Sequence, residues 1–481
     1  MFFRMIYDNA LAQAAYLIGC QRTGEAIVID PERDVDRYIA FAQQEKLRIT
    51  AVAETHIHAD FLSGTRELAE KTGAKAYLSD EGDADWKYQW LNKKAGGGSY
   101  NHQLLHHGDT FKVGNIVFTV VHTPGHTPEH LCFMVTDTGG GANEPMGIVS
   151  GDFVFVGDLG RPDLLESAAG MAGAKEVSAR TLFKSAQQFM RLPDFLQVWP
   201  AHGAGSACGK ALGAVPQSTV GYEKRFNPSL RAATDEQTFV NSILEGQPEP
   251  PMYFATMKRL NRDGPPVLGS LPTPKELHAT DLARIDARKV AVLDTRPWGR
   301  FRAGHLPGSL HCPFNNQFPT VAGSFVKESE QIVLICDAAH VDECVRMLIR
   351  IGLDHVTGHA TPAMLETSGA KLVQTREIDA TTFIQEMQDP NAFVLDVRRA
   401  SEYESGHVPG SLNVAHTRLL GHIGEVPHGR PLLVHCAGGA RSAYATSLLE
   451  RNGFTATNIA GGFMAYEKAG GEVVREMAGV A

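Results

Sequence analysis

An internal repeat constrains the second half of the chain more than any other feature. The stretch DTRPWGRFRAGHLPGSLHCP at residues 294–313 matches DVRRASEYESGHVPGSLNVA at residues 396–415, and the downstream apolar runs IVLIC and LLVHC end at Cys336 and Cys436. Each copy has an apolar strand, a turn containing proline and glycine, a second apolar strand and a helical pattern. Because alternating strands and helices predict a parallel sheet, we expect two small α/β domains, residues 274–373 and residues 376–481.

A segment rich in proline and glycine, residues 247–274, separates these repeats from the first half of the chain. In residues 1–270, β-like runs such as EAIVID and NIVFTVVH alternate with helical stretches such as VDRYIAFAQQEK. We expect this half to form a single α/β domain. Three domains in 481 residues agree with an ordinary domain size of roughly 150 residues.

The composition indicates the cellular compartment of the protein and excludes some classes of binding partner. The formal net charge of -9 argues against nucleic-acid binding. Seven cysteines, none in a CxxC pair, fit a reducing compartment better than a disulfide framework. The N-terminal segment lacks the continuous apolar core of a signal peptide, and no apolar run approaches the length of a membrane span. We expect a cytoplasmic protein without nucleic-acid or membrane partners, with homo-oligomer formation left open.

Histidine and aspartate side chains follow one strand after another in the first domain. The candidates are His56, His58 and Asp60 in ETHIHADF, His122 in VHTPGHT, Asp152 in IVSGDF and His202 in VWPAHG. Loops that follow the strands of an α/β fold can converge at one edge of the sheet. A single histidine is most often an ordinary polar residue, but this ordered set predicts a metal site.

These motifs, THxHxD, HTPGHT, SGD and PAHG, resemble the metallo-β-lactamase superfamily, which includes glyoxalase II, over essentially residues 1–250. The segment SGDFVFVGDLGRPDL resembles the persulfide dioxygenases of that superfamily. The resemblance implies an αββα sandwich and one Fe(II) per chain, held by His56, His122 and Asp152. Two histidines and a carboxylate leave positions open for substrate and O2, as in non-haem iron oxygenases, whereas a closed zinc site leaves none.

The remaining candidates would act around that ion. On the same resemblance, His58, Asp60 and His202 would orient the ligands or a water molecule. Arg161 would anchor either its own loop or an anionic substrate. Two further histidines in this region are expected to be structural or to support the ligands from behind; these are His126 and His130.

One departure from the family pattern concerns the number of metals. Binuclear hydrolases of this fold have HxHxDH, and this chain has Phe61 in place of the final histidine. A phenyl ring cannot bind a metal, so we favour a mononuclear site. A binuclear site that is merely loosened by Phe61 is the alternative.

The second repeat carries a candidate nucleophile. Cys436 opens CAGGARS, which comes directly after an apolar strand and directly before a helical pattern. A loop that curls around the sulfur aims backbone N–H groups at it, and the helix N-terminus and Arg441 add positive charge. Gly438 and Gly439 permit the tight curl. These features favour a thiolate, which is the nucleophile in sulfur transfer.

Residues 376–481 resemble a rhodanese domain in DVRxxxEYxxGHVPGSLN, CxxGxRS and AGGF. The resemblance implies that Cys436 alternates between thiolate and persulfide, with Arg441 as its catalytic partner. Asp396 and Arg398 would hold the fold together. The loop that cradles the sulfur would comprise Ala437, Gly438, Gly439 and Ala440.

The first repeat departs from this pattern. DAAHVDEC follows Cys336, without glycine or arginine at the cradle positions. We expect residues 274–373 to be a degenerate copy with a structural or docking role, and Cys336 as a second sulfur carrier is the alternative.

An iron domain joined to rhodanese copies resembles the bacterial fusions of persulfide dioxygenase and rhodanese that act in sulfide detoxification. The implied activity is oxidation of a low-molecular-weight persulfide by O2 to sulfite, with Cys436 exchanging sulfur between persulfide, sulfite and thiosulfate. The thiol that carries the persulfide, whether glutathione, coenzyme A or another, is left open. The alternatives are a thioester hydrolase of the glyoxalase II kind joined to a sulfurtransferase, and a non-catalytic sulfur carrier or sensor.

Overall fold

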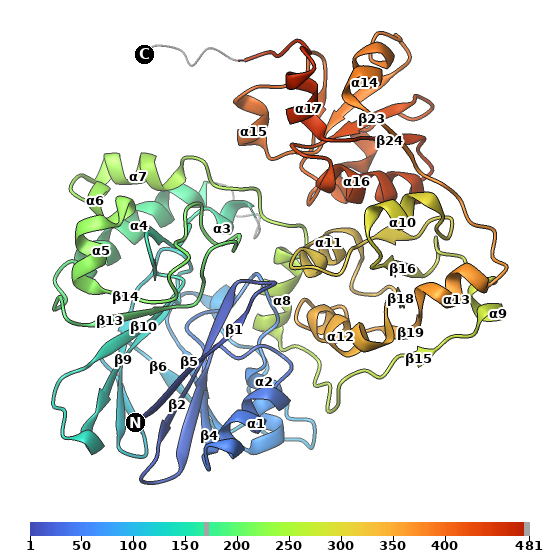
Figure 1. Ribbon diagram of the computed structural model, residues 1–481. Helices are drawn as coiled ribbons and strands as arrows, with labels where there is room; N and C mark the ends of the chain where they lie inside the picture. The colour runs from blue at the N-terminus through green and yellow to red at the C-terminus, as the bar shows by residue number, and fades with distance from the viewer. Residues whose placement is uncertain (168–172, 476–481) are drawn as a thin grey trace. The chain divides into compact units, whose positions relative to one another are not determined.

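The computed structural model describes residues 1–167 and 173–475 (Figure 1). The chain divides into two compact units. The first contains Met1–Ser270 with the short segment Ile349–Gly352, and the second contains Leu271–Leu348 with Leu353–Ala481. In the described part of the chain, no helix is both long and apolar enough to cross a membrane. Residues 476–481, the end of the predicted second repeat, lie outside the described residues.

The first unit is built on two six-stranded sheets. The first sheet has the order β1-β2-β3-β4-β5-β6, antiparallel from β1 to β3 and parallel from β3 to β6. Its strands are β1 (Phe2–Asp8), β2 (Gln13–Cys20), β3 (Glu25–Ile29), β4 (Arg48–Ala53), β5 (Lys75–Ser79) and β6 (His102–Leu105). The second sheet has the order β14-β13-β10-β9-β8-β7. Its strands are β7 (Thr110–Val113), β8 (Ile116–His122), β9 (Leu131–Asp137), β10 (Gly147–Gly151), β13 (Gln197–Pro200) and β14 (Ser218–Thr219).

Apolar side chains of both sheets meet in a central core that includes Ile18, Ile29, Phe118 and Phe133. Helices α1 (Asp36–Gln44) and α2 (Thr65–Thr72) pack on β4 of the first sheet (Figure 1). Helices α4 (Ala174–Phe189) and α7 (Glu236–Leu244) share an apolar core with β10 and β13 of the second. The layers are therefore helix, sheet, sheet and helix, which confirms the predicted αββα sandwich. The unit also contains β11 (Val154–Phe155), β12 (Asp158–Leu159), α3 (Leu164–Ser167), α5 (Val220–Phe226), α6 (Pro228–Ala232) and α8 (Phe254–Asp263).

The second unit contains the two repeats, and each forms a five-stranded parallel sheet. The orders β15-β19-β18-β16-β17 and β20-β24-β23-β21-β22 correspond strand for strand. The first sheet comprises β15 (Lys275–Glu276), β16 (Ala291–Asp294), β17 (Leu310–His311), β18 (Ile332–Ile335) and β19 (Val356–Ala360). The second comprises β20 (Arg376–Ile378), β21 (Phe393–Asp396), β22 (Leu412–Asn413), β23 (Leu432–His435) and β24 (Ala456–Ile459). The predicted pair of α/β repeats is thus confirmed.

Helices flank both of these sheets. The first copy has α9 (Ala279–Leu282), α10 (Trp298–Ala303), α11 (Phe318–Phe325), α12 (Val341–Ile349) and α13 (Pro362–Thr367). The second has α14 (Ala380–Glu386), α15 (Ala400–Glu404), α16 (Ala440–Arg451) and α17 (Gly462–Lys468).

A buried ion pair recurs at the same place in both copies. Arg398 donates to both carboxylate oxygens of Asp396 and also to the Gly406 carbonyl at 2.8 Å. Arg296 and Asp294 form the same fork in the first copy. A guanidinium fork with its partner and a backbone acceptor satisfies charges that would be costly to bury alone. These pairs connect the end of one strand to the following turn, the structural role expected of Asp396 and Arg398.

Candidate metal centre and sulfur-binding loop

Three buried side chains converge where three strands of the first unit end. His56 follows β4, His126 lies in the turn after β8, and Asp152 directly follows β10. Asp152 Oδ2 lies 3.4 Å from His126 Nε2 and 3.9 Å from His56 Nε2. One ligand atom from each of the three residues lies within 4.8 Å of the other two, which is the spacing of groups that could hold one metal ion.

Hydrogen bonds fix the direction in which both histidines present their free nitrogen. His126 Nδ1 is 2.9 Å from the Arg161 carbonyl, so Nδ1 carries the proton and donates it. His56 Nδ1 is 3.0 Å from Thr55 Oγ1, whose hydroxyl itself donates to Asp30. In both rings the lone pair of Nε2 therefore faces Asp152. Ligating histidines in metalloproteins are oriented in this way by a partner on their other nitrogen.

The same region contains buried polar atoms that no hydrogen bond satisfies. Among the described residues these include His56 Nε2 and both carboxylate oxygens of Asp152. Leaving such atoms buried without partners is costly, and native proteins rarely do so. A cation would satisfy several of them at once, so the residues present fit a metal ion.

His122, the histidine predicted as a ligand from the sequence, does not join this group. Its Nε2 donates to the Pro128 carbonyl at 2.8 Å, and its side chain is 24% exposed. His126 takes its place, because the turn after β8 carries the second histidine of HTPGHT over the site. The ligand set that the structure supports is His56, His126 and Asp152. His130, by contrast, is structural: its Nε2 accepts a hydrogen bond from the backbone N–H of Asp152 at 3.0 Å.

A second group of potential ligands lies beside the first. Asp60, His202 and Cys208 also present ligand atoms within 4.8 Å of one another. His202 Nε2 lies 3.1 Å from Asp60 Oδ2 and 3.4 Å from Asp152 Oδ1, so Asp152 stands between the two groups. Cys208 was not predicted from the sequence. Its only signal was a position six residues after His202, in PAHGAGSACG.

Phe61 is fully buried, and its ring centroid lies 4.3 Å from that of His58. Its apolar ring therefore occupies the position at which the HxHxDH pattern of binuclear hydrolases has a metal-binding histidine. His58 Nε2 lies 3.2 Å from Asp30 Oδ1. Burial alone would lower the pKa of His58, but the Asp30 carboxylate outweighs it and raises the pKa to about 9. His58 is therefore held by Asp30, a residue that was not predicted from the sequence.

Arg161 anchors its loop. Its guanidinium donates to both carboxylate oxygens of Asp163, at 2.8 and 2.6 Å, and to the Ala207 carbonyl at 3.0 Å, and the residue is 1% exposed. Of the two roles considered for Arg161, the contacts support the structural one. The structure requires the glycine of the GRPDL motif at position 160, because a Cβ there would stand 1.7 Å from the Asp152 carbonyl oxygen.

The sulfur loop of the second unit lies between β23 and α16. Cys436 follows β23 and is 1% exposed, and its Sγ accepts hydrogen bonds from the Gly439 N–H at 3.1 Å and the Ser442 hydroxyl at 3.5 Å. Gly439 has φ +97°, a left-handed conformation that favours glycine. Gly462 of the AGGF motif supports the loop from behind, because a Cβ there would approach the Cys436 carbonyl oxygen to 2.3 Å. The loop geometry therefore accounts for Gly439 and Gly462. A Cβ at Gly438 would meet no atom within 4 Å and this residue has no positive φ, so the structure does not require the glycine that was predicted to permit the curl there.

Arg441 stands in the first turn of α16 and donates through both terminal nitrogens to Glu402, at 2.6 and 2.7 Å. The same guanidinium also interacts with the Cys436 sulfur. Glu402 thus fixes the arginine and offsets part of its charge. Glu402 was not predicted from the sequence.

His416 is expected to make the second unit sensitive to acid. It is 8% exposed, its Nε2 has no hydrogen-bond partner, and burial, assisted by the Arg441 charge, lowers its pKa to about 3. As the pH falls, His416 takes up a proton in the unfolded state before it does so in the folded state. The free energy of unfolding therefore has its full value above about pH 6.5 and decreases as the pH falls towards 3. At pH 5 the loss is about 2 kcal/mol. Thermal unfolding at pH 7.5 and pH 5 would measure it. His416→Gln should reduce the difference, and the exposed His428→Gln should leave it unchanged.

In the first copy, Cys336 directly follows β18, in the position equivalent to Cys436, and its thiol lies against that of Cys344 on α12. This contact, followed by burial, raises the pKa of Cys344. Both cysteines are fully buried. No glycine loop surrounds Cys336.

Comparisons with known proteins agree with this architecture. Residues 8–202 match the metallo-beta-lactamase superfamily, and residues 278–365 and 379–469 each match the rhodanese-like domain. A solved structure described as a metallo-beta-lactamase from Staphylococcus aureus subsp. aureus COL is 41% identical, with a TM-score of 0.67, over 75% of this chain and 99% of that one. The chain belongs to the metallo-β-lactamase superfamily and carries two rhodanese-like domains after its metallo-β-lactamase domain.

Two curated relatives are similar to part of the chain. A beta-lactamase hydrolase-like protein from Xylella fastidiosa (strain 9a5c) is 30% identical over 49% of this chain and 53% of its own length. A hydroxyacylglutathione hydrolase from Polaromonas sp. (strain JS666 / ATCC BAA-500) is 32% identical over 41% of this chain and 65% of its own length. The chain spans about half the length of the first curated relatives it matches.

Proposed function

We propose that the first domain oxidises a low-molecular-weight thiol persulfide with O2 and that Cys436 transfers sulfane sulfur. In the first reaction a persulfide, O2 and water give the free thiol, sulfite and two protons. The observation that carries the proposal is the joining, in one chain, of a buried group of two histidines and one carboxylate to a cysteine held in a rhodanese loop. That ligand set is typical of non-haem iron oxygenases.

His56, His126 and Asp152 would hold one Fe(II) ion. The ion would supply a site for the persulfide sulfur and the redox chemistry that O2 requires. The chain's own residues orient the donors: the Arg161 carbonyl and the Thr55 hydroxyl fix the two imidazole rings. Burial of all three donors excludes bulk water from their surroundings.

At Cys436 the transfer would run through a persulfide of the enzyme. The Sγ thiolate attacks the outer sulfur of a persulfide, and the carrier thiol leaves as its thiolate. Sulfite then attacks the outer sulfur of the Cys436 persulfide, which gives thiosulfate and returns the Sγ thiolate. Donors from Gly439 and Ser442 stabilise negative charge on Sγ, the leaving group of this second step.

Joining both activities in one chain raises the effective concentration of their shared intermediates. Sulfite made in the first domain is the acceptor in the second, and persulfide is a substrate of both. The small molecules that the protein would bind or produce are therefore a persulfide, O2, sulfite and thiosulfate.

A thioester hydrolase joined to a sulfurtransferase is the second candidate. Asp60, His202 and Cys208 favour it, since they could hold a second metal ion despite Phe61, and one relative is described as a hydroxyacylglutathione hydrolase. Two metal ions commonly activate water in hydrolases.

The two candidates predict opposite results with two probes. With glutathione persulfide, we expect the enzyme to consume one O2 for each sulfite formed, measured with an oxygen electrode and a sulfite assay. With the thioester S-lactoylglutathione we expect no hydrolysis above background. Thioester hydrolysis without O2 uptake would instead identify the hydrolase.

A further inference from the structure

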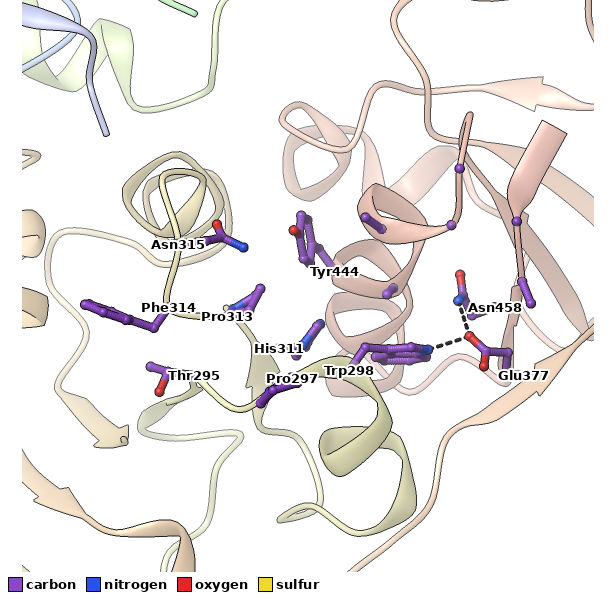
Figure 2. A pocket seen from close by; sticks show the side chains of 16 residues that line it. Thr295, Pro297, Trp298, His311, Pro313, Phe314, Asn315, Glu377, Tyr444 and Asn458 are labelled. Carbon is purple, nitrogen blue, oxygen red and sulfur yellow. Dashed lines mark hydrogen bonds between the residues drawn. The ribbon is translucent and has the colours of Figure 1, made fainter. Parts of the chain in front are cut away.

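Hydrogen bonds join the two rhodanese-like copies of the second unit beside a cavity of about 530 Å³ (Figure 2). His311 lines this cavity from the first copy, and Asn458 lines it from the second. Glu377 of the second copy accepts hydrogen bonds from the Trp298 indole of the first copy and from Asn458 Nδ2, the latter at 2.8 Å, as the dashed lines in Figure 2 show. These side chains tie the copies to each other and add no reactive group.

A carboxyl group ties together the loops that carry two of the metal ligands in the first unit. Glu129 lies three residues after His126, and its Oε1 accepts the backbone N–H of Ile57 at 2.7 Å. Ile57 directly follows His56, so this bond holds the peptide on one side of that ligand. On the other side, the Thr55 carbonyl accepts the backbone N–H of the first residue of β9 at 2.7 Å. Both peptide neighbours of His56 are therefore held by the segment that follows His126.

The residue after Glu129 holds the third ligand. The backbone N–H of Asp152 donates to His130 Nε2 at 3.0 Å, so the proton of this neutral ring is on Nδ1. That Nδ1 donates to Thr123 Oγ1 at 2.8 Å, and Thr123 belongs to the same turn as His126. Two consecutive side chains of one turn therefore contact the backbones of both other ligand-bearing loops.

Packing alone does not explain a glutamate at position 129. The side chain is fully buried, and an apolar residue of similar size would avoid the cost of removing a carboxyl group from water. Burial raises the pKa of Glu129 to about 7, although the hydrogen bond from the Ile57 N–H acts in the opposite direction. Whether the group is ionised or protonated, it keeps an oxygen that can accept this N–H. The hydrogen bond therefore depends on the reach of the side chain and does not require its charge.

We propose that Glu129 is a positioning residue of the metal centre. By holding the Ile57 N–H, it fixes the backbone at His56 and thus the place from which this imidazole reaches the metal, while His130 does the same for Asp152. The turn that carries His126 thereby sets the spacing of all three ligands, and groups behind the ligands are known to control metal affinity in this way. This inference rests on the metal site of the proposed function, but it concerns metal binding and not the reaction with O2.

Two conservative substitutions separate the reach of this side chain from its charge. Glu129→Gln removes the charge but keeps an oxygen at the same distance from the backbone. Glu129→Asp keeps the charge but removes one methylene group, which withdraws the oxygens from the Ile57 N–H by about 1.5 Å. The matched control is Glu144→Asp, which makes the same change at an exposed glutamate in the loop between β9 and β10.

Each full-length protein, stripped of metal, is titrated with Co(II), whose visible d–d absorption bands report the geometry of its ligands. Glu129→Asp should bind Co(II) about ten-fold more weakly than the unsubstituted protein, or weaker still, and its bands should shift. Glu129→Gln should bind within about three-fold of the unsubstituted protein, because a neutral oxygen is only a slightly poorer acceptor, and its bands should not shift. Glu144→Asp should match the unsubstituted protein in both respects.

Weaker binding and shifted bands in Glu129→Asp alone support the proposal. The reverse ranking would show that the charge matters and the position does not, and it would overturn the proposal, as would wild-type binding in both variants or an equal loss in both. Thermal unfolding without metal is measured alongside, and a Glu129→Asp protein that does not fold would assign Glu129 to the stability of the fold instead. Unsubstituted protein that binds Co(II) but, with iron, consumes no O2 would refute the proposed reaction and leave this inference standing. Unsubstituted protein that binds no Co(II) would refute both.

Discussion

Cys436→Ser is expected to abolish sulfur transfer from thiosulfate to cyanide, a loss of roughly 10³-fold or more, and to leave sulfite production from glutathione persulfide intact. A serine hydroxyl cannot form a persulfide, although it would sit among the same donors from Gly439 and Ser442. A colorimetric thiocyanate assay and a sulfite assay on the same preparation would measure both activities.

The matched control is Cys336→Ser, at the equivalent strand end of the degenerate copy. Because no glycine loop surrounds Cys336, we expect transfer to continue in this variant at close to the wild-type rate. A large loss there would mean that Cys336 is a second sulfur carrier. If sulfite production also disappeared in Cys436→Ser, the proposal that the metal centre and the Cys436 loop catalyse separate reactions would be wrong.

His126→Ala is expected to lower O2 uptake with glutathione persulfide by more than about 100-fold and to lower the bound metal, because it removes a ligand. His122→Ala tests the assignment directly. His122 lies only four residues earlier but donates to the Pro128 carbonyl, so this variant should retain its metal and most of its activity. An oxygen electrode and metal analysis of both variants would provide the comparison.

The opposite ranking, with His122→Ala inactive and His126→Ala active, would contradict the ligand set. Sulfur loading of Cys436 should persist in His126→Ala, since the loop that holds Cys436 belongs to the other compact unit. An unsubstituted protein that binds persulfide but consumes no O2 would instead be a carrier or sensor.

Much of the fold could be predicted from local patterns. The repeated turn GHxPGSL and the apolar strands that end at Cys336 and Cys436 predicted two α/β copies, because strand period and turn chemistry are local properties of the sequence. The Cys436 loop was equally predictable, since its glycines, its arginine and the helix after it are consecutive in the chain.

The metal centre was only partly predictable. HTPGHT contains two histidines, and the preference for the residue at the strand end selected His122, although the turn after β8 brings His126 to Asp152. Cys208 lies six residues after His202, a spacing that does not by itself identify a ligand. Asp30 comes close to His58 only through folding. The same holds for Asn458 and His311, which line one cavity from different copies.

Metal analysis of protein purified without oxygen tests the central claim most directly. We expect one iron per chain, and the addition of persulfide and O2 should then produce sulfite. Two metal ions per chain, with the second bound by Asp60, His202 and Cys208, in a protein that does not consume O2, would contradict the account.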